Sequence, residues 1–191
     1  MKLADRITIT LAGEEVELHP ALRHAIRLER REGSFRKLLA DISEGSLTAA
    51  VEIISDHYSD ATFIKNRVFD AGVDNLAPSL TRYVIACTGL DPYDDEQPKR
   101  GKPSRAPVAM QSFEERLREL YRWGAGWLGW TPENTLDATP TEIMEAYRGK
   151  LDMLKAVYGG GETEKPVDDR PLADKFRSVF GSIGTTKAQE A

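Results

Sequence analysis

The 191-residue chain is poor in the residues that build disulfides and most metal sites. It has one cysteine, Cys87, and three histidines. A single cysteine cannot form a disulfide within the chain, which fits a reducing compartment. The cysteine and histidines do not follow a zinc-type spacing, and no HExxH motif occurs. We therefore expect no disulfide framework, no metal site and no cofactor.

Long apolar runs and an excess of positive charge are also missing. No stretch approaches the eighteen or so consecutive apolar residues of a membrane span, and the start, MKLADRITITL, lacks the apolar region of a signal peptide. The net charge is −5, whereas a nucleic-acid-binding protein would show a basic stripe. We expect a cytoplasmic protein that binds neither membrane nor nucleic acid.

Catalytic patterns are equally scarce. Cys87 lies on the apolar stripe of a predicted helix and is expected to be a core residue. The glycines 159–161 are not followed by the Lys-Ser/Thr of a phosphate loop. The acids of 91–96 lack the register of a calcium loop, and His24 and His57 are expected at the surface or at helix ends. The sequence predicts a protein that is not an enzyme.

Residues 1–90 predict a compact domain with a β-hairpin and about five helices. Apolar and polar residues alternate over 7–11 and 15–18, which is the pattern of a half-buried hairpin. Gly33 is expected to end the first helix and Ser46 to cap the third, and the fifth helix is expected to follow Pro78 and Ser79. The predicted inward stripes are Leu22, Ala25 and Ile26; Phe35, Leu38, Leu39 and Ile42; Leu47, Ala50, Val51 and Ile54; Phe63, Ile64, Val68 and Phe69; Leu80, Tyr83, Val84 and Cys87.

Residues 112–158 predict a small helical domain rich in tryptophan. Ser112 with Glu115, and Thr139 with Glu142, fit capping boxes that begin two helices, and 131–138 are expected to connect them. The first stripe is Phe113, Leu117, Leu120 and Tyr121, continued at helical spacing by Trp123, Trp127 and Trp130; the second is Ile143, Tyr147, Leu151, Leu154 and Tyr158.

Two polar stretches complete the predicted organisation. Residues 91–111 are rich in proline and charge and predict a flexible linker between the two domains. A second flexible stretch, 159–191, contains a short amphipathic pattern at 171–180 that carries Leu172, Phe176 and Phe180. The expected fold class is mainly α: an N-terminal α+β domain joined by the linker to a small α-helical domain.

The tryptophans pose the sharpest functional question. Three of them within eight residues carry more apolar area than two helices easily hide. They either form a small core, which the usual burial of tryptophan favours, or face a partner. The candidate partner-binding residues are Tyr121, Trp123, Trp127 and Trp130, together with Leu172, Phe176 and Phe180.

Three stretches of the sequence resemble a known protein family. The N-terminal ITITLAGEEVELHPALRHAIRLER and the following FRKLLADISEGSLTAAVEII are similar to the small tail assembly chaperones of long-tailed, siphovirus-like phages and of gene transfer agents. The later LYRWGAGWLGWTPENTLDATPTEIMEAYRGKL is similar to the C-terminal extension of the same family. The longer tail, 159–191, departs from the family pattern, and its role is open.

The resemblance implies a virion morphogenesis protein that is absent from the mature particle. Such a chaperone works in the bacterial host cytoplasm, coats the tape measure protein, keeps it soluble and recruits tail tube subunits. The extended form often arises by translational frameshifting, and such a junction would fall within 91–111. We expect residues 1–90 to self-associate as a homo-oligomer and to bind the tape measure protein, and the tryptophan region to bind the tube protein.

Two other non-enzymatic interpretations stay open. The same segments would serve a protein-interaction adaptor without any phage connection. They would also serve a minor tail structural protein, such as a terminator or connector, which would remain in purified particles.

Overall fold

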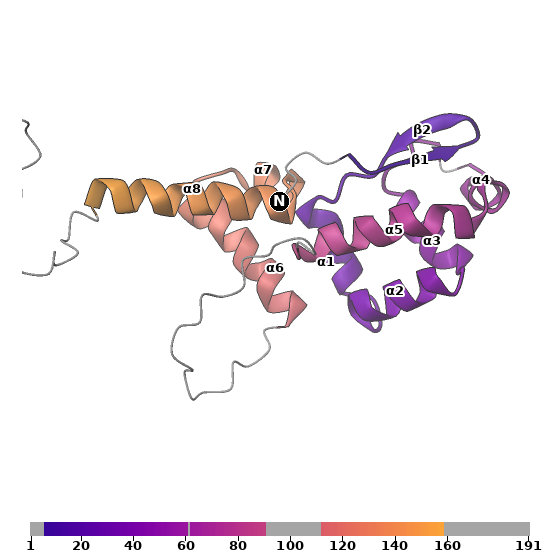
Figure 1. Cartoon of the computed structure of the whole chain (residues 1–191), viewed down its shortest axis with the longest axis horizontal. Helices are drawn as coiled ribbons and strands as arrows, with labels where there is room; N and C mark the ends of the chain where they lie inside the picture. Colours follow the sequence, from indigo (N-terminus) through magenta and orange to yellow (C-terminus); the bar gives the residue numbers. More distant parts are fainter. Residues whose placement is uncertain (1–5, 61, 91–111, 159–191) are drawn as a thin grey trace, which may run out of the picture. The chain divides into compact units, whose positions relative to one another are not determined.

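The computed structural model describes residues 6–60, 62–90 and 112–158 (Figure 1). These residues are mainly helical with one antiparallel hairpin, so the predicted fold class is confirmed. The elements are β1 (Thr8–Leu11), β2 (Glu14–Glu17), α1 (Leu22–Glu29), α2 (Ser34–Ser43), α3 (Leu47–Ile54), α4 (Ile64–Ala71), α5 (Val73–Thr88), α6 (Phe113–Arg122), the π-helix η1 (Trp123–Trp127), α7 (Pro132–Asp137) and α8 (Pro140–Tyr158).

The hairpin forms as its sequence predicts. Ala12 and Gly13 both have positive φ angles, 51° and 81°, as a two-residue turn that matches the strand twist requires. Ile9 then lies opposite Val16 in the register, and both are buried. One face of the hairpin therefore contributes to the core, while its glutamates remain exposed.

Helix α5 is the central element of the core. It contacts α1, α2, α3, α4 and β1, and Leu80, Tyr83 and Cys87 on it are completely buried. We predicted that this helix begins after Pro78 and Ser79; it begins at Val73 and includes both residues. The longer helix buries Leu76. Pro78 has no N–H to donate to the carbonyl of Asp74 four residues earlier, and Asp74 is an exposed residue.

Two other predicted boundaries are wrong. Helix α1 ends at Glu29, and Gly33, with φ of 77°, instead precedes α2. The predicted connection 131–138 contains α7, in which the Thr131 hydroxyl accepts the Asn134 N–H at 3.1 Å. The Thr131-Pro132 pair is the usual signal for a helix start.

The described residues after 111 pack on the N-terminal helices instead of forming a separate unit. The contacts divide the chain between Asp152 and Met153, and Leu117, Leu120 and Ile143 belong to the same buried cluster as the hairpin and α1–α5. The rings of Phe35 and Phe113 meet edge to face at 5.3 Å.

Polar contacts reinforce this packing. The Leu22 N–H donates to the Ala138 carbonyl at 2.9 Å, and Arg116 donates to the Gly89 carbonyl at 3.1 Å. A pair of helices this small cannot bury its own apolar faces. Accordingly, α6 and α7 pack against α1, and Ile143 of α8 lies in the shared core. The predicted linker 91–111 and tail 159–191 lie outside the described residues.

None of the helices in the described part of the chain is long and apolar enough to cross a membrane.

Candidate functional site

An aromatic cluster of Trp123, Trp127 and Tyr147 is the candidate site. The rings of Trp123 and Tyr147 are stacked, with centroids 4.5 Å apart and planes inclined by 10°. Trp127 meets the same tyrosine at 6.4 Å and 66°. The Trp127 side chain is 61 % exposed, so the cluster presents a large aromatic surface to solvent on top of a stacked base.

A capping box and a π-turn place the cluster. The Ser112 hydroxyl accepts the Glu115 N–H, and the Glu115 carboxylate accepts the Ser112 N–H, both at 3.2 Å, which fixes the start of α6. After Arg122 the helix widens, and the Leu128 N–H donates to the Trp123 carbonyl five residues back at 2.8 Å. Such π-turns are frequent at functional sites.

Gly124 makes this wide turn possible. A Cβ atom there would lie 2.4 Å from Cγ2 of Thr135, whose side chain is completely buried. The turn therefore packs directly against α7. This contact fixes the backbone of η1, which carries Trp127.

The predicted helical stripe of three tryptophans is wrong beyond Trp127. Gly129 has a φ of 74°, and Trp130 lies after the helix, where its N–H donates to the Gly124 carbonyl at 3.0 Å. Tyr121, Trp123 and Trp130 are half-buried against the core. The core interpretation thus applies to these three, while Trp127 faces solvent. Leu172, Phe176 and Phe180 lie outside the described residues.

Tyr147 is the site residue that the sequence analysis missed. We assigned it to one apolar stripe of the second helix, with Ile143, Leu151, Leu154 and Tyr158. On α8 only Ile143 of that stripe is completely buried; Leu151 is exposed, and Tyr158 is 79 % exposed. Helical periodicity marks an apolar face without showing whether the protein's own core covers it, so spacing alone could not separate Tyr147 from Ile143.

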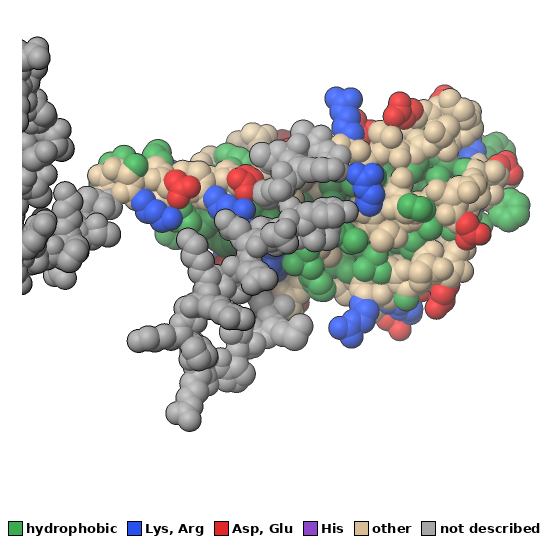
Figure 2. All heavy atoms as spheres, in the orientation of Figure 1, with side chains coloured by type: hydrophobic (Ala, Val, Ile, Leu, Met, Phe, Trp, Pro, Cys, Tyr) green, Lys and Arg blue, Asp and Glu red, His purple; other side chains and the backbone are tan. Residues whose placement is uncertain are grey.

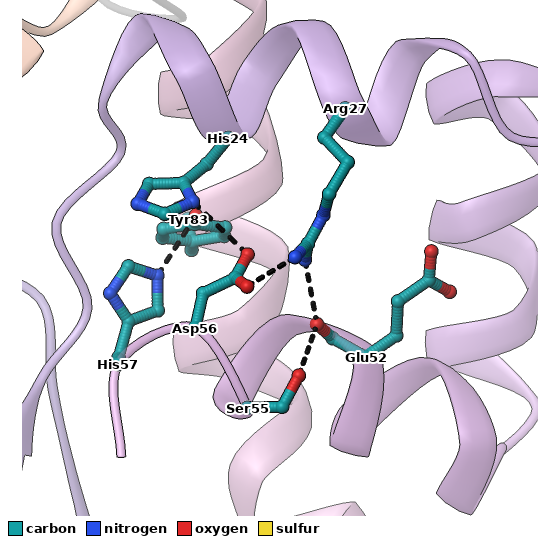
Figure 3. A network of polar contacts seen from close by, with 7 residues as sticks. All are labelled: His24, Arg27, Glu52, Ser55, Asp56, His57 and Tyr83. Carbon is teal, nitrogen blue, oxygen red and sulfur yellow. Dashed lines mark hydrogen bonds and ion pairs between the residues drawn. The ribbon is translucent and has the colours of Figure 1, made fainter. Parts of the chain in front are cut away.

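A polar network connects three segments of the N-terminal part of the chain (Figure 3). The Asp56 carboxylate accepts a hydrogen bond from Nδ1 of His24 at 3.0 Å and pairs with Arg27. Nε2 of His57 lies 3.0 Å from the Tyr83 hydroxyl, and the two imidazole rings are 4.9 Å apart. Because these residues come from α1, from the turn after α3 and from α5, the network joins segments that are distant in sequence.

Burial sets the electrostatics of this network. Desolvation, followed by the nearby His24, lowers the pKa of His57 to about 4. Desolvation also lowers the pKa of His24, although Asp56 opposes it. Burial raises the pKa of Cys87 to about 12, so its thiol is protonated at neutral pH, consistent with the predicted core role.

Within the described residues, no group of three histidine, cysteine, aspartate or glutamate side chains could hold a metal ion. Two open hollows share Thr10 and Ala71 in their linings. The first lies between β1 and α5, from Thr8 to Ser79, and the second lies between the hairpin and α4, from Gly13 to Arg67. Neither is lined by the histidines of the polar network. The aromatic cluster, with its exposed Trp127 over the stacked Trp123 and Tyr147, is therefore the candidate surface for a partner.

No protein-family model matches the chain, and neither the curated proteins nor the solved structures include a significant match.

Proposed function

We propose that this protein is a tail assembly chaperone, which binds and solubilises a tape measure protein and recruits tail tube subunits without covalent chemistry. The observation that carries the proposal is the exposed Trp127 on the stacked pair of Trp123 and Tyr147. Exposed aromatic anchors on a rigid support are typical of protein-binding surfaces. The assignment to tail assembly rests on the sequence resemblance.

The two tasks fall on different parts of the chain. The aromatic cluster binds the tube subunit. Two capping boxes and the close contact of Gly124 with Thr135 hold the cluster rigid. Rigid anchors lose little conformational entropy on binding. Residues 1–90 bind the tape measure protein and carry the self-association. Several copies along one long helical chain would then bind with avidity and release stepwise.

A co-expression experiment tests the proposal. The tagged full chain is expressed with the long helical protein encoded beside it and with the tube subunit, and the retained proteins are identified. We expect the wild type to retain both. Trp127→Ala should lose the tube subunit and keep the tape measure protein, while Tyr158→Ala, which removes an exposed aromatic ring of α8, should retain both.

Two results would contradict the proposal. Retention of neither protein by the wild type would favour an adaptor with other partners. Finding the chain in purified particles would favour a minor tail structural protein, since a chaperone leaves before the tail is complete.

A further inference from the structure

The C-terminal end of α8 carries an apolar face made of Leu151, Leu154, Val157 and Tyr158, here called the α8 end face. Val157 is 63 % exposed and Tyr158 is 79 % exposed; Leu151 is also exposed, and Leu154 is half-buried. Figure 2 shows hydrophobic side chains where Figure 1 draws the end of this helix. In the part of the chain that the structure describes, none of the four belongs to the hydrophobic core or packs against it.

This face continues the stripe by which α8 joins the core. Ile143 is completely buried, and Tyr147 is half-buried. Three further residues follow at spacings of four, three and four: Leu151, Leu154 and Tyr158. Residues three or four apart lie on the same side of a helix. One apolar stripe is therefore covered where α8 begins and exposed where it ends.

The exposed phenylalanines of α4 do not form such a stripe. We predicted one inward stripe of Phe63, Ile64, Val68 and Phe69. The two phenylalanines are exposed, whereas Ile64 and Val68 are buried. At 3.6 residues per turn, positions 63 and 69 lie about 120° apart, one on each side of the buried face. They do not offer one narrow face along which a helix could pack.

The chain that follows α8 contains an apolar segment of matching period. Leu172, Phe176 and Val179 succeed one another at spacings of four and three. When α8 is read backwards from Tyr158, its stripe has the same two spacings. An antiparallel pair of helices would therefore form three apolar layers: Tyr158 with Leu172, Leu154 with Phe176, and Leu151 with Val179.

The residues around this segment favour a short helix that returns along α8. Pro171 and Gly181 stand at its two ends, where a helix start and a helix end favour them. Twelve residues, 159–170, separate it from Tyr158, and an antiparallel helix pair needs a connection of only about 2 to 8 residues. The connection leaves from the end of α8, so the antiparallel direction is the shortest return.

Tethering favours this segment over a second copy of the chain. A segment joined to its site by a short linker has an effective concentration on the order of millimolar. A second copy would have to reach a similar concentration to compete for the α8 end face. The segment also gains from docking, because a helix of about ten residues is marginal by itself in water.

We propose that residues 171–180 form a short helix that packs antiparallel on the α8 end face of the same chain. Docking removes apolar surface from water on both helices, which stabilises the pair. Leu172 and Phe176, which we expected to bind a separate protein, then contact α8. This inference does not depend on the proposed function.

Disulfide formation in the full chain tests the proposal. Leu154→Cys combined with Phe176→Cys places one thiol on each side of the central layer. Ala156→Cys combined with Phe176→Cys is the matched control, because Ala156 is exposed and lies about 200° around α8 from position 154. In a glutathione redox buffer, the effective concentration of the first pair of thiols should be at least tenfold higher than that of the control pair. Cys87 is completely buried and should not take part.

Non-reducing gel electrophoresis shows whether the disulfide lies within one chain. The proposal expects monomers with an internal disulfide for the first pair. Equal effective concentrations for the two pairs would mean that the segment does not dock on this face. Cross-linked dimers as the main product of the first pair would mean that a second copy covers it. Either result would overturn the proposal.

Amide exchange at the end of α8 provides an independent measurement. Phe176→Asp puts a charge into the central layer and should speed the exchange of amides 153–158 at least tenfold. Ser178→Asp puts the same charge about 200° around the segment and should leave their exchange unchanged. Exchange that does not respond to Phe176→Asp, or that responds equally to both variants, would contradict the proposed docking.

Discussion

At the scale of single residues, His57 is held in its neutral form by its surroundings. Desolvation lowers its pKa from 6.5 to about 4; His24, Arg27 and Asp56 lie around it, and it is hydrogen-bonded to Tyr83. Between these two pH values the unfolded chain binds a proton that the folded chain does not. The stability that depends on neutral His57 should therefore be complete above pH 6.5. The free energy of unfolding should fall as the pH drops from 6.5 towards 4.

Urea unfolding at several pH values measures this loss. We expect the free energy of unfolding to fall by about 1 to 2 kcal/mol between pH 6.5 and pH 4. The loss is smaller than it would be for a fully buried ring, because the His57 ring is partly exposed. His57→Gln should make the free energy of unfolding less dependent on pH in this range. Part of the dependence should remain, because the pKa of His24 is lowered as well. A slope that is the same in the variant and the wild type would show that His57 is not its source.

Two glycines of η1 provide a matched pair. A Cβ atom on Gly124 would lie 2.4 Å from Thr135, whereas a Cβ atom on Gly126 would meet nothing within 4 Å. Gly124→Ala should therefore lower the free energy of unfolding by about 1 to 3 kcal/mol. Gly126→Ala should leave it unchanged or raise it by up to about 1 kcal/mol. Thermal unfolding followed by tryptophan fluorescence compares them, and equal effects would disprove the packing role of Gly124.

Individual caps were predictable from the sequence, but the polar network was not. Ser46, Ser112 and Thr139 act on N–H groups three residues away, so the sequence contains the whole signal. The contact of His57 with Tyr83 joins the turn after α3 to α5, and only the packing of these two segments brings the side chains together.

At the scale of elements, two capping boxes determine where α6 and α8 begin. The Thr139 hydroxyl accepts the Glu142 N–H at 3.2 Å, and the Glu142 carboxylate accepts the Thr139 N–H at 2.8 Å. Ser112→Ala and Thr139→Ala should each cost about 0.5 to 2 kcal/mol in urea unfolding. Thr48→Ala, at an exposed position inside α3, should change stability by less than about 0.5 kcal/mol. Indistinguishable results for the three variants would contradict the capping role.

Elements with strong local signals were predicted, and those that depend on tertiary packing were not. The hairpin follows from alternation and the Ala12-Gly13 turn, and the starts of α3, α6 and α8 follow from their caps. The start of α5 was misplaced because Pro78 is an apparent boundary, yet burial of Leu76 extends the helix past it. The π-turn depends on the fit of Gly124 against Thr135, which spacing does not reveal.

At the scale of the whole molecule, the described residues up to Asp152 share one core. Ile143 is completely buried in the same cluster as Leu22 and Phe35. Ile143→Ala should lower the stability of this whole unit by about 2 to 5 kcal/mol. Tryptophan fluorescence reports on residues 123–130, and amide exchange reports on α2 and α3. The two probes should show the same loss; a loss confined to the fluorescence would mean that two domains unfold separately.

The single core was not predictable from composition. The polar stretch 91–111 has the composition of a linker, and the sequence does not show which surface the apolar stripe of Leu117 and Leu120 covers. For the same reason, the sequence did not show that Phe63 and Phe69 are exposed. Sequence therefore identified the fold class and the tryptophan region, while burial alone separated Trp127 from its neighbours.

The affinity of the full chain for the tail tube subunit tests the central claim most directly. Calorimetry should compare the wild type, Trp127→Phe and Trp127→Ala, with a thermal melt of each. Because Trp127 is 61 % exposed, the melting temperatures should agree. The Kd should rise at least about tenfold for Trp127→Ala and less for Trp127→Phe, which keeps a ring. An unchanged Kd in a folded Trp127→Ala variant would contradict the assignment of the aromatic cluster as the binding surface.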